Sequence, residues 1–276
     1  MNALEIHGLT KRRGDFALQG LDLTLPAGCI MGLIGENGAG KSTTIRLILN
    51  GLRRDGGTIA VYGKDNRALT ALEREDIGVV LDEVGLPEYM NAQQIGCMMA
   101  GIFTRWQPEV YRDYLRRLAL PEDKPFRDFS RGMKMKQGLA VALSHQPKLL
   151  LLDEATSGLD PVVRDEILTI FSDFTRDEEH AVLLSSHIVS DLEKICDYIA
   201  FLHKGRLLLC EEKDRLTEAY GILRGGAEDI DPAAVCGRHT TPYGTEYLVR
   251  RDAVPVGMAL GQVNLEDMFV FMAKEV

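Results

Sequence analysis

Apolar residues follow different periods in different parts of the chain, and these periods predict its elements. In residues 17–25 apolar and polar positions alternate, which predicts a strand with one face in water. Residues 29–34 and 149–152 are instead continuous apolar runs, as in strands that are buried on both faces. Shorter apolar segments predict further strands at 4–9, 58–61, 77–81 and 181–185, and a hairpin at 199–202 and 206–210.

The period changes to that of a helix from about residue 85 to residue 142. Apolar side chains recur there at intervals of three and four residues, namely Ile95, Met98, Met99, Ile102, Tyr111, Tyr114, Leu115 and Leu118. We therefore expect a helical subdomain inserted into an α/β core. After the insertion, Asp160 and Pro161 have the residue types of a helix cap and of a first helical position, which predicts another helix.

The pattern weakens beyond about residue 214. Gly, Pro and Asp are frequent through 221–244, residues 245–250 resemble a strand, and Asn264 precedes an apolar stripe of helical period. The predicted organisation is a main domain at 1–214, with the helical subdomain at about 85–142, and a small C-terminal extension at 215–276.

Composition narrows the classes of partner. The net charge of −9 argues against nucleic acid, whose phosphates require a basic surface. Five scattered cysteines without a C-x-x-C spacing give little support for zinc or disulfides, and suggest reduced thiols in the cytoplasm. The N-terminus lacks the features of a signal peptide, and no apolar run approaches the ~18 residues that span a bilayer. A membrane function would therefore need a partner that crosses the membrane.

A glycine-rich motif follows the buried strand at 29–34. The pattern G-x-x-x-x-G-K-[ST] is matched by Gly35, Glu36, Asn37, Gly38, Ala39, Gly40, Lys41 and Ser42, with Thr43 next. Residues 35–43, called the phosphate loop below, are expected to surround the phosphates of ATP with backbone N–H groups. Lys41 would reach the β- and γ-phosphates, and the Ser42 hydroxyl would bind Mg²⁺.

Two carboxylates end the apolar run at 149–152. In a parallel sheet, ligands bind beyond the carboxyl ends of the strands, which would bring Asp153 and Glu154 to the phosphate loop. Asp153 would hold Mg²⁺, and Glu154 would orient and deprotonate the attacking water. An acid in that position favours hydrolysis over transfer of phosphate to another substrate.

The order of these motifs resembles the nucleotide-binding subunit of an ABC transporter over about residues 3–215. Residues 157–160 resemble the D-loop of that family, and His187 follows the next strand, where the family has its switch histidine. Residues 129–133, called the signature segment below, resemble the motif LSGGQ and retain Ser130 and Gly132. The resemblance implies that His187 contacts the γ-phosphate, and that Ser130 and Gly132 bind the ATP of a second subunit.

The resemblance also implies a fold and a set of partners. The fold would be α/β: a P-loop NTPase core with an antiparallel β subdomain, the inserted helical subdomain and a small α+β extension. ATP and Mg²⁺ would be bound between two ATP-binding subunits, each associated with an integral membrane permease subunit at the inner face of the cell membrane. The short extension resembles that of export-type subunits, including those of antibiotic or peptide efflux.

Four positions depart from the family pattern, among them Met133 at the end of the signature segment. The family usually has Gln where this chain has Asp82, which is expected to bind Mg²⁺ while adding negative charge near the phosphates. Arg13 occupies the position of the aromatic residue that stacks on adenine, with Phe16 as a nearby alternative whose ring would otherwise be core packing. In the signature segment, Arg131 replaces the usual glycine.

Two alternatives compete with the transport function. A soluble ABC ATPase acting on ribosomes or nucleic acid would carry two cassettes or long coiled coils, whereas this chain has one cassette, no long heptad run and an acidic charge balance. A P-loop kinase leaves the signature segment and His187 unexplained. A GTPase should contain Asn-Lys-x-Asp, which the sequence lacks.

Overall fold

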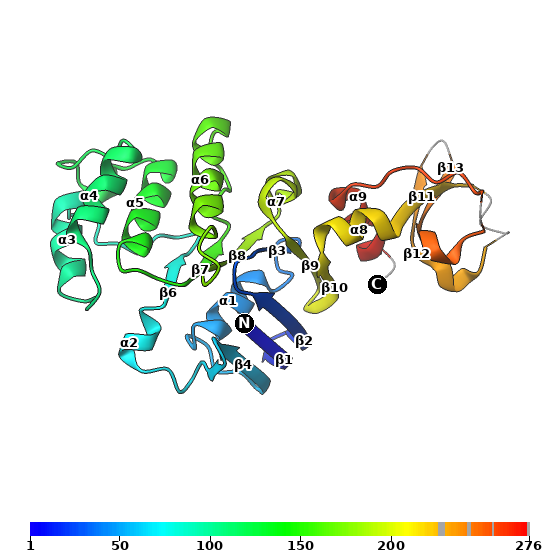
Figure 1. Cartoon of the computed structure of the whole chain (residues 1–276), viewed down its shortest axis with the longest axis horizontal. Helices are drawn as coiled ribbons and strands as arrows, with labels where there is room; N and C mark the ends of the chain where they lie inside the picture. The colour runs from blue at the N-terminus through cyan, green and yellow to red at the C-terminus, as the bar shows by residue number, and fades with distance from the viewer. Residues whose placement is uncertain (226–229, 242–243, 256, 275–276) are drawn as a thin grey trace.

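A six-stranded sheet lies at the centre of the computed structural model, which describes residues 1–225, 230–241, 244–255 and 257–274 (Figure 1). Its strands lie in the order β10 (Arg206–Glu212), β9 (Tyr198–His203), β3 (Ile30–Ile34), β8 (Ala181–Ser186), β7 (Leu149–Asp153) and β6 (Ile77–Val80). All neighbours are parallel except β9 and β10. The carboxyl ends of the five parallel strands therefore meet at one edge.

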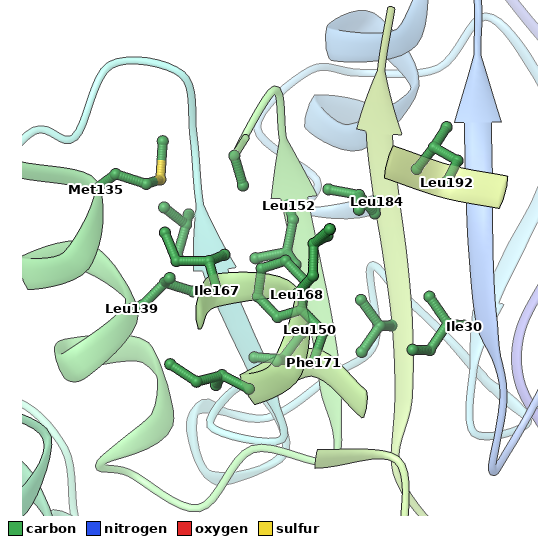
Figure 2. Packing of buried hydrophobic residues seen from close by; sticks show 14 of the residues in the cluster. Ile30, Met135, Leu139, Leu150, Leu152, Ile167, Leu168, Phe171, Leu184 and Leu192 are labelled. Atoms are coloured by element: carbon green, nitrogen blue, oxygen red, sulfur yellow. The ribbon is translucent and has the colours of Figure 1, made fainter. Parts of the chain in front are cut away.

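Both faces of this sheet are covered, which explains its continuous apolar strands. Leu149 and Leu151 of β7 belong to a cluster with the N-terminal strands and α1 (Lys41–Ile48). The alternate residues, Leu150 and Leu152, face a second cluster that includes α5 (Arg131–Leu143), α6 (Pro161–Phe174) and α7 (Val189–Ile195) (Figure 2). Successive side chains of a strand point to opposite faces, so each face receives its own set of leucines.

An antiparallel sheet packs on the first of these faces. Its order is β2 (Phe16–Pro26), β1 (Asn2–Arg13), β4 (Gly56–Val61) and β5 (Lys64–Asp65). The predicted strand at 4–9 is part of the longer β1, because the chain continues to pair with β2 as far as the hairpin turn. This arrangement brings the turn between β1 and β2 towards the end of β3.

Three helices follow β6 at one end of the molecule (Figure 1). They are α3 (Ala92–Ala100), α4 (Pro108–Arg117) and α5. Their buried residues include Ile95, Tyr111 and Leu115, as the helical period predicts. Ile102 is an exception, because α3 ends before it and its side chain is 61% exposed.

Tyr111 joins the three helices through a buried hydrogen-bonded junction. Its hydroxyl donates to the backbone O of Ala92 in α3 at 2.8 Å. The side-chain amide of Gln137 in α5 donates to the same hydroxyl. Gln137 is fully buried, and its Oε1 has no hydrogen-bond partner among the described residues. The rings of Trp106 and Tyr111 lie 5.1 Å apart, centroid to centroid.

Glu75 ties these helices to the core. It ends the short α2 (Ala71–Arg74), and its carboxylate accepts the backbone N–H groups of Thr104 and Arg105 at 2.9 and 3.0 Å. Burial raises the pKa of Glu75, but these hydrogen bonds outweigh it, so the pKa lies below its ordinary value. Glu75 is thus held ionised at the junction.

The chain after β10 forms a second antiparallel sheet at the other end of the molecule (Figure 1). The strands of this sheet are β11 (Tyr220–Arg224), β12 (Val235–Thr241) and β13 (Gly244–Arg250), in the order β11–β13–β12. The helix α8 (Lys213–Ala219) precedes the sheet, and α9 (Leu265–Lys274) follows it. The sequence predicted only β13 and α9 of these elements. Asn264 caps α9 as predicted, because its side chain accepts the N–H of Asp267 at 2.7 Å.

Helix α9 attaches the extension to the core. Glu193 of α7 accepts the backbone N–H of Leu265 at 2.8 Å, and the ring of Phe269 meets that of Phe201 edge to face at 5.4 Å. Leu248 and Phe271 belong to the same hydrophobic cluster as the core helices. None of the helices in the described ranges has the length and apolarity needed to cross a membrane.

Candidate active site

The phosphate loop connects β3 to α1 at the carboxyl edge of the central sheet. Gly40, which precedes α1, has φ of +116°, a backbone conformation that favours glycine. A Cβ added at this position would lie 2.8 Å from Cζ of Phe16. Lys41 begins the helix and folds back over the loop, where its ammonium donates to the backbone O of Gly35 at 2.7 Å. The backbone N–H groups at the start of α1 and the Lys41 ammonium make this end of the helix a site for anions.

The turn between β9 and β10 supports the loop from outside. The N–H of Gly205 donates to the backbone O of Ala39 at 2.9 Å. His203, which is buried at the end of β9, has its Nδ1 3.1 Å from Oε1 of Glu36. His203 was not among the predicted site residues, because a single histidine at a strand end has no distinguishing pattern.

The two acids predicted to complete the site lie at the end of β7. Asp153 is buried, and its Oδ1 accepts a hydrogen bond from the Ser185 hydroxyl at 2.6 Å. Glu154 has φ of +53°, which is uncommon for a residue with a side chain and places backbone strain at this turn. The backbone O of Ser185 accepts the N–H of Glu154 at 3.1 Å. Ser185 therefore positions both acids, although it was not among the predicted site residues.

Glu154 lies between a cation and a histidine. Its Oε1 is 3.0 Å from Lys41 Nζ, and its Oε2 is 2.7 Å from Nδ1 of His187. The Glu154 side chain is 13% exposed, whereas that of His187 is 44% exposed. Three residues that are far apart in the sequence thus form one connected group beside the phosphate loop.

A cleft of about 360 Å³ opens beside Lys41 and Glu154 of this group. It is lined by Arg13, Phe16, Glu36, Asn37, Gly38, Gly40, Lys41, Ser42, Thr43, Asp82 and Glu154. Its lining does not include Asp153, which is buried, or His187, and it does not include Ser130 and Gly132 of the signature segment. Most of the predicted nucleotide-binding residues therefore surround one cleft.

The two candidates for adenine stacking are neighbours at the rim of the cleft. Arg13 and Phe16 face each other across the hairpin turn between β1 and β2. Asp55 holds this end of β1, because it accepts the Lys11 ammonium at 2.8 Å and the Arg12 N–H at 2.7 Å. The hydrogen bond from the Lys11 side chain, followed by that from the Arg12 backbone, keeps the pKa of Asp55 below its ordinary value.

The signature segment forms the beginning of α5. Ser130 caps the helix by accepting the N–H of Met133 at 3.3 Å, so it has the structural role of a helix cap in this chain. Arg131 turns towards the end of β6, where its Nη2 lies 2.6 Å from Oδ1 of Asp82. Two residues that depart from the family pattern are therefore in contact with each other.

The residues near the phosphate loop suit a hard cation that also binds phosphate. Asp153 has one carboxylate oxygen hydrogen-bonded to Ser185, and the partly buried hydroxyl of Ser42 follows Lys41. The described ranges contain no group of three or more His, Cys, Asp or Glu residues that could enclose a metal ion. Magnesium needs no such cage, because it commonly binds through one or two protein oxygens together with substrate phosphates and water.

Comparison with known proteins identifies the family. A family model described as "ABC transporter" matches residues 18–157. The chain belongs to the ABC transporter family. The P-loop NTPase fold class predicted from the sequence is confirmed by a solved structure of an ATP-binding subunit of an ABC transporter, which has a TM-score of 0.71 and 26% identity. That match covers 78% of this chain and 92% of the other.

Relatives of this ABC subunit serve transport or drug resistance. It is 32% identical to the lantibiotic transport ATP-binding protein SrtF of Streptococcus pyogenes, over 76% of this chain and 91% of that one. It is 35% identical to the daunorubicin/doxorubicin resistance ATP-binding protein DrrA of Streptomyces peucetius, over 86% and 74% respectively. The protein is thus an ATP-binding and ATP-hydrolysing subunit of an ABC transporter. Neither the family nor these relatives support the alternative of a soluble ATPase acting on ribosomes or nucleic acid.

Proposed function

We propose that Glu154 is the general base of ATP hydrolysis and that Lys41 and His187 control its two carboxylate oxygens. The contacts of Glu154 with both residues carry this proposal. Lys41 begins α1 beside the glycines of the phosphate loop, so the β- and γ-phosphates of ATP would compete with Glu154 for its ammonium. As Lys41 turns to the phosphates, Oε1 of Glu154 becomes available to accept a proton from water. Oε2 stays oriented by His187.

Magnesium would be held by Ser42 and Asp153, which offer the oxygen ligands that this cation prefers. When bound, it would neutralise charge on the β- and γ-phosphates. Ser185 keeps the Asp153 carboxylate in one orientation through the hydrogen bond at 2.6 Å. A ligand role for Asp82 stays a prediction. Its Oδ1 is paired with Arg131, so binding of Mg²⁺ through that oxygen would compete with the ion pair.

The signature segment would act on the ATP of a second subunit. Ser130 and Gly132 lie at the N-terminal end of a 13-residue helix, where N–H groups and the helix dipole favour an anion. They do not line the cleft of their own chain. A face-to-face dimer, either of identical or of different subunits, would bring them to the γ-phosphate of the partner's ATP. Arg13 and Phe16 are the candidates for stacking on adenine at the rim.

The partner in the membrane would be an integral permease subunit of the efflux type. The relatives in lantibiotic transport and in daunorubicin/doxorubicin resistance support this proposal. The subunit would then sit at the inner face of the membrane and drive export. Co-expression with a candidate permease and transport into inverted vesicles tests it, since export predicts ATP-dependent accumulation of the substrate inside them.

Replacing Glu154 by Gln tests the catalytic and dimer proposals together. Gln keeps the shape but cannot accept the proton, so ATP should bind without turnover. We expect a stable dimer in light scattering with ATP and phosphate release reduced by about 100-fold or more. Glu179→Gln is the matched control, since Glu179 pairs with Lys148 on an exposed surface and should leave turnover unchanged. A monomer under these conditions contradicts the dimer, and undiminished turnover contradicts the role of Glu154.

A further inference from the structure

An ion pair links the nucleotide edge of the sheet to the signature segment. Asp82 comes shortly after β6, Arg131 is the first residue of α5, and their side chains meet at 2.6 Å across 49 positions of sequence. Both side chains are about half exposed, at 51% and 53%. The pair therefore joins two segments that the proposed mechanism assigns to different ATP molecules.

Asp82 of this pair lines two clefts. Asp82 lines the cleft of the phosphate loop and also a second cleft of about 500 Å³, to which Arg131, Lys134 and Glu88 contribute. Arg131 also lies over the turn after β7, since an added Cβ at Gly158 would be 3.2 Å from its Nη1. The guanidinium is thus held between the end of β6 and the turn that follows Glu154.

We propose that the Asp82–Arg131 pair is an exchangeable latch that opposes closure of the ATP-bound dimer. This inference rests on the proposed function, in which the start of α5 meets the γ-phosphate of the partner's ATP. In the proposed exchange, the guanidinium of Arg131, which stands between Ser130 and Gly132, moves from Asp82 to the same phosphate. To bind it, the guanidinium must leave Asp82.

The chemistry of the pair suits such an exchange. A guanidinium binds carboxylate and phosphate with the same planar fork of donors, so a phosphate can replace Asp82 directly. An ion pair that is half exposed to water contributes little to stability, so the exchange needs only a modest driving force. The usual glycine at position 131 could form neither contact. In this chain the acid and the arginine therefore act together.

The test measures ATP-dependent dimerisation in the Glu154→Gln background. Asp82→Asn keeps the side-chain shape but removes the charge that holds Arg131. We expect the ATP concentration for half-maximal dimerisation, followed by light scattering, to fall about two- to fivefold, the range of an exposed ion pair. Arg131→Gln removes the latch and the phosphate contact, and should raise that concentration. Adding Asp82→Asn to Arg131→Gln should then change nothing further.

Two controls separate the latch from other effects. Glu109→Gln breaks a comparable exposed ion pair with Arg112 at 2.8 Å within α4, and should leave dimerisation unchanged. Binding of a fluorescent ATP analogue to the monomer is measured for both proteins, because Asp82 also lines the nucleotide cleft, and the latch predicts that the gain in dimerisation exceeds any gain in this binding. An equal gain in monomer binding would mean that Asp82 acts on the nucleotide of its own cleft, and would overturn the latch.

The outcomes distinguish the latch from the proposed function. In one outcome, the Glu154→Gln parent dimerises with ATP while Asp82→Asn leaves the ATP concentration for dimerisation unchanged or raises it. In that case the latch is wrong and the face-to-face dimer stands. Weaker dimerisation would show that the carboxylate is needed as a cation ligand. If the parent does not dimerise with ATP, the face-to-face dimer is contradicted, and the latch is contradicted with it.

Discussion

Removing the hydroxyl of Tyr111 should destabilise the helical part of the molecule. Burial raises the pKa of Tyr111 to about 12, so at neutral pH the phenol donates its proton to Ala92 and accepts from Gln137. In Tyr111→Phe, the buried amide of Gln137 loses its partner, while its Oε1 is already without one among the described residues. A buried polar group without a partner costs about 1–3 kcal/mol, and that is the expected loss in the free energy of unfolding.

Urea unfolding followed by tryptophan fluorescence measures this loss. The only tryptophan, Trp106, lies against the ring of Tyr111 and reports directly on these helices. Circular dichroism of the same samples reports on the whole chain. The thermal midpoint should also fall, by about 2–4 °C for each kcal/mol lost.

Two further variants show whether the hydrogen bonds are the cause. Tyr114→Phe removes a hydroxyl from a half-buried ring of the same helix and should change the free energy of unfolding by less than about 0.5 kcal/mol. Replacing both partners by apolar groups can be nearly neutral, so Tyr111→Phe with Gln137→Leu should be more stable than Tyr111→Phe alone. If the double variant is the less stable of the two, or if Tyr111→Phe costs nothing, the reasoning is refuted.

Three other variants or probes follow from the fold and the site. Gly40→Ala should fold but bind a fluorescent ATP analogue at least tenfold more weakly, because its Cβ would collide with Phe16; unchanged binding would contradict this. Glu75→Gln should cost about 1.5–3 kcal/mol at pH 7. Because the folded-state pKa of Glu75 is lowered, its contribution is present above the ordinary pKa of 4.5 and is lost as pH falls, so urea melts of wild type and variant should converge in acid. Thiol reagents should modify the exposed Cys97 in the native protein, as mass spectrometry would reveal. Cys196 is buried and its pKa is raised, so it should react only after unfolding.

The elements around the candidate active site were predictable, because each is determined by residues close to it in the sequence. A run of apolar residues determines a strand buried on both faces, and the glycines of the phosphate loop specify a turn that other residues adopt with strain. The Asp160–Pro161 start of α6 is equally local, since Asp160 accepts the N–H groups of the two residues after Pro161. These signals lie within a few residues of the feature they predict.

The contacts that connect the site were not predictable in the same way. Ser185 meets Asp153, and Arg131 meets Asp82, only after strands and helices that are far apart in the sequence have packed. The extension shows a related limit. Strand β11 is buried through pairing with β13 and through a bridge between Ile222 and Gly261, so its own residue pattern carries little periodicity.

The docking of α9 has a consequence for how the protein unfolds. Leu248 and Phe271 of the extension share one continuous hydrophobic cluster with Phe201 and Leu192 of the ATPase core. Opening the extension would expose the apolar residues of α7 that pack against it, so this opening costs more free energy than the fraying of an undocked segment. We therefore expect the docked C-terminal segment to slow the exchange of amide hydrogens in the helix that follows His187.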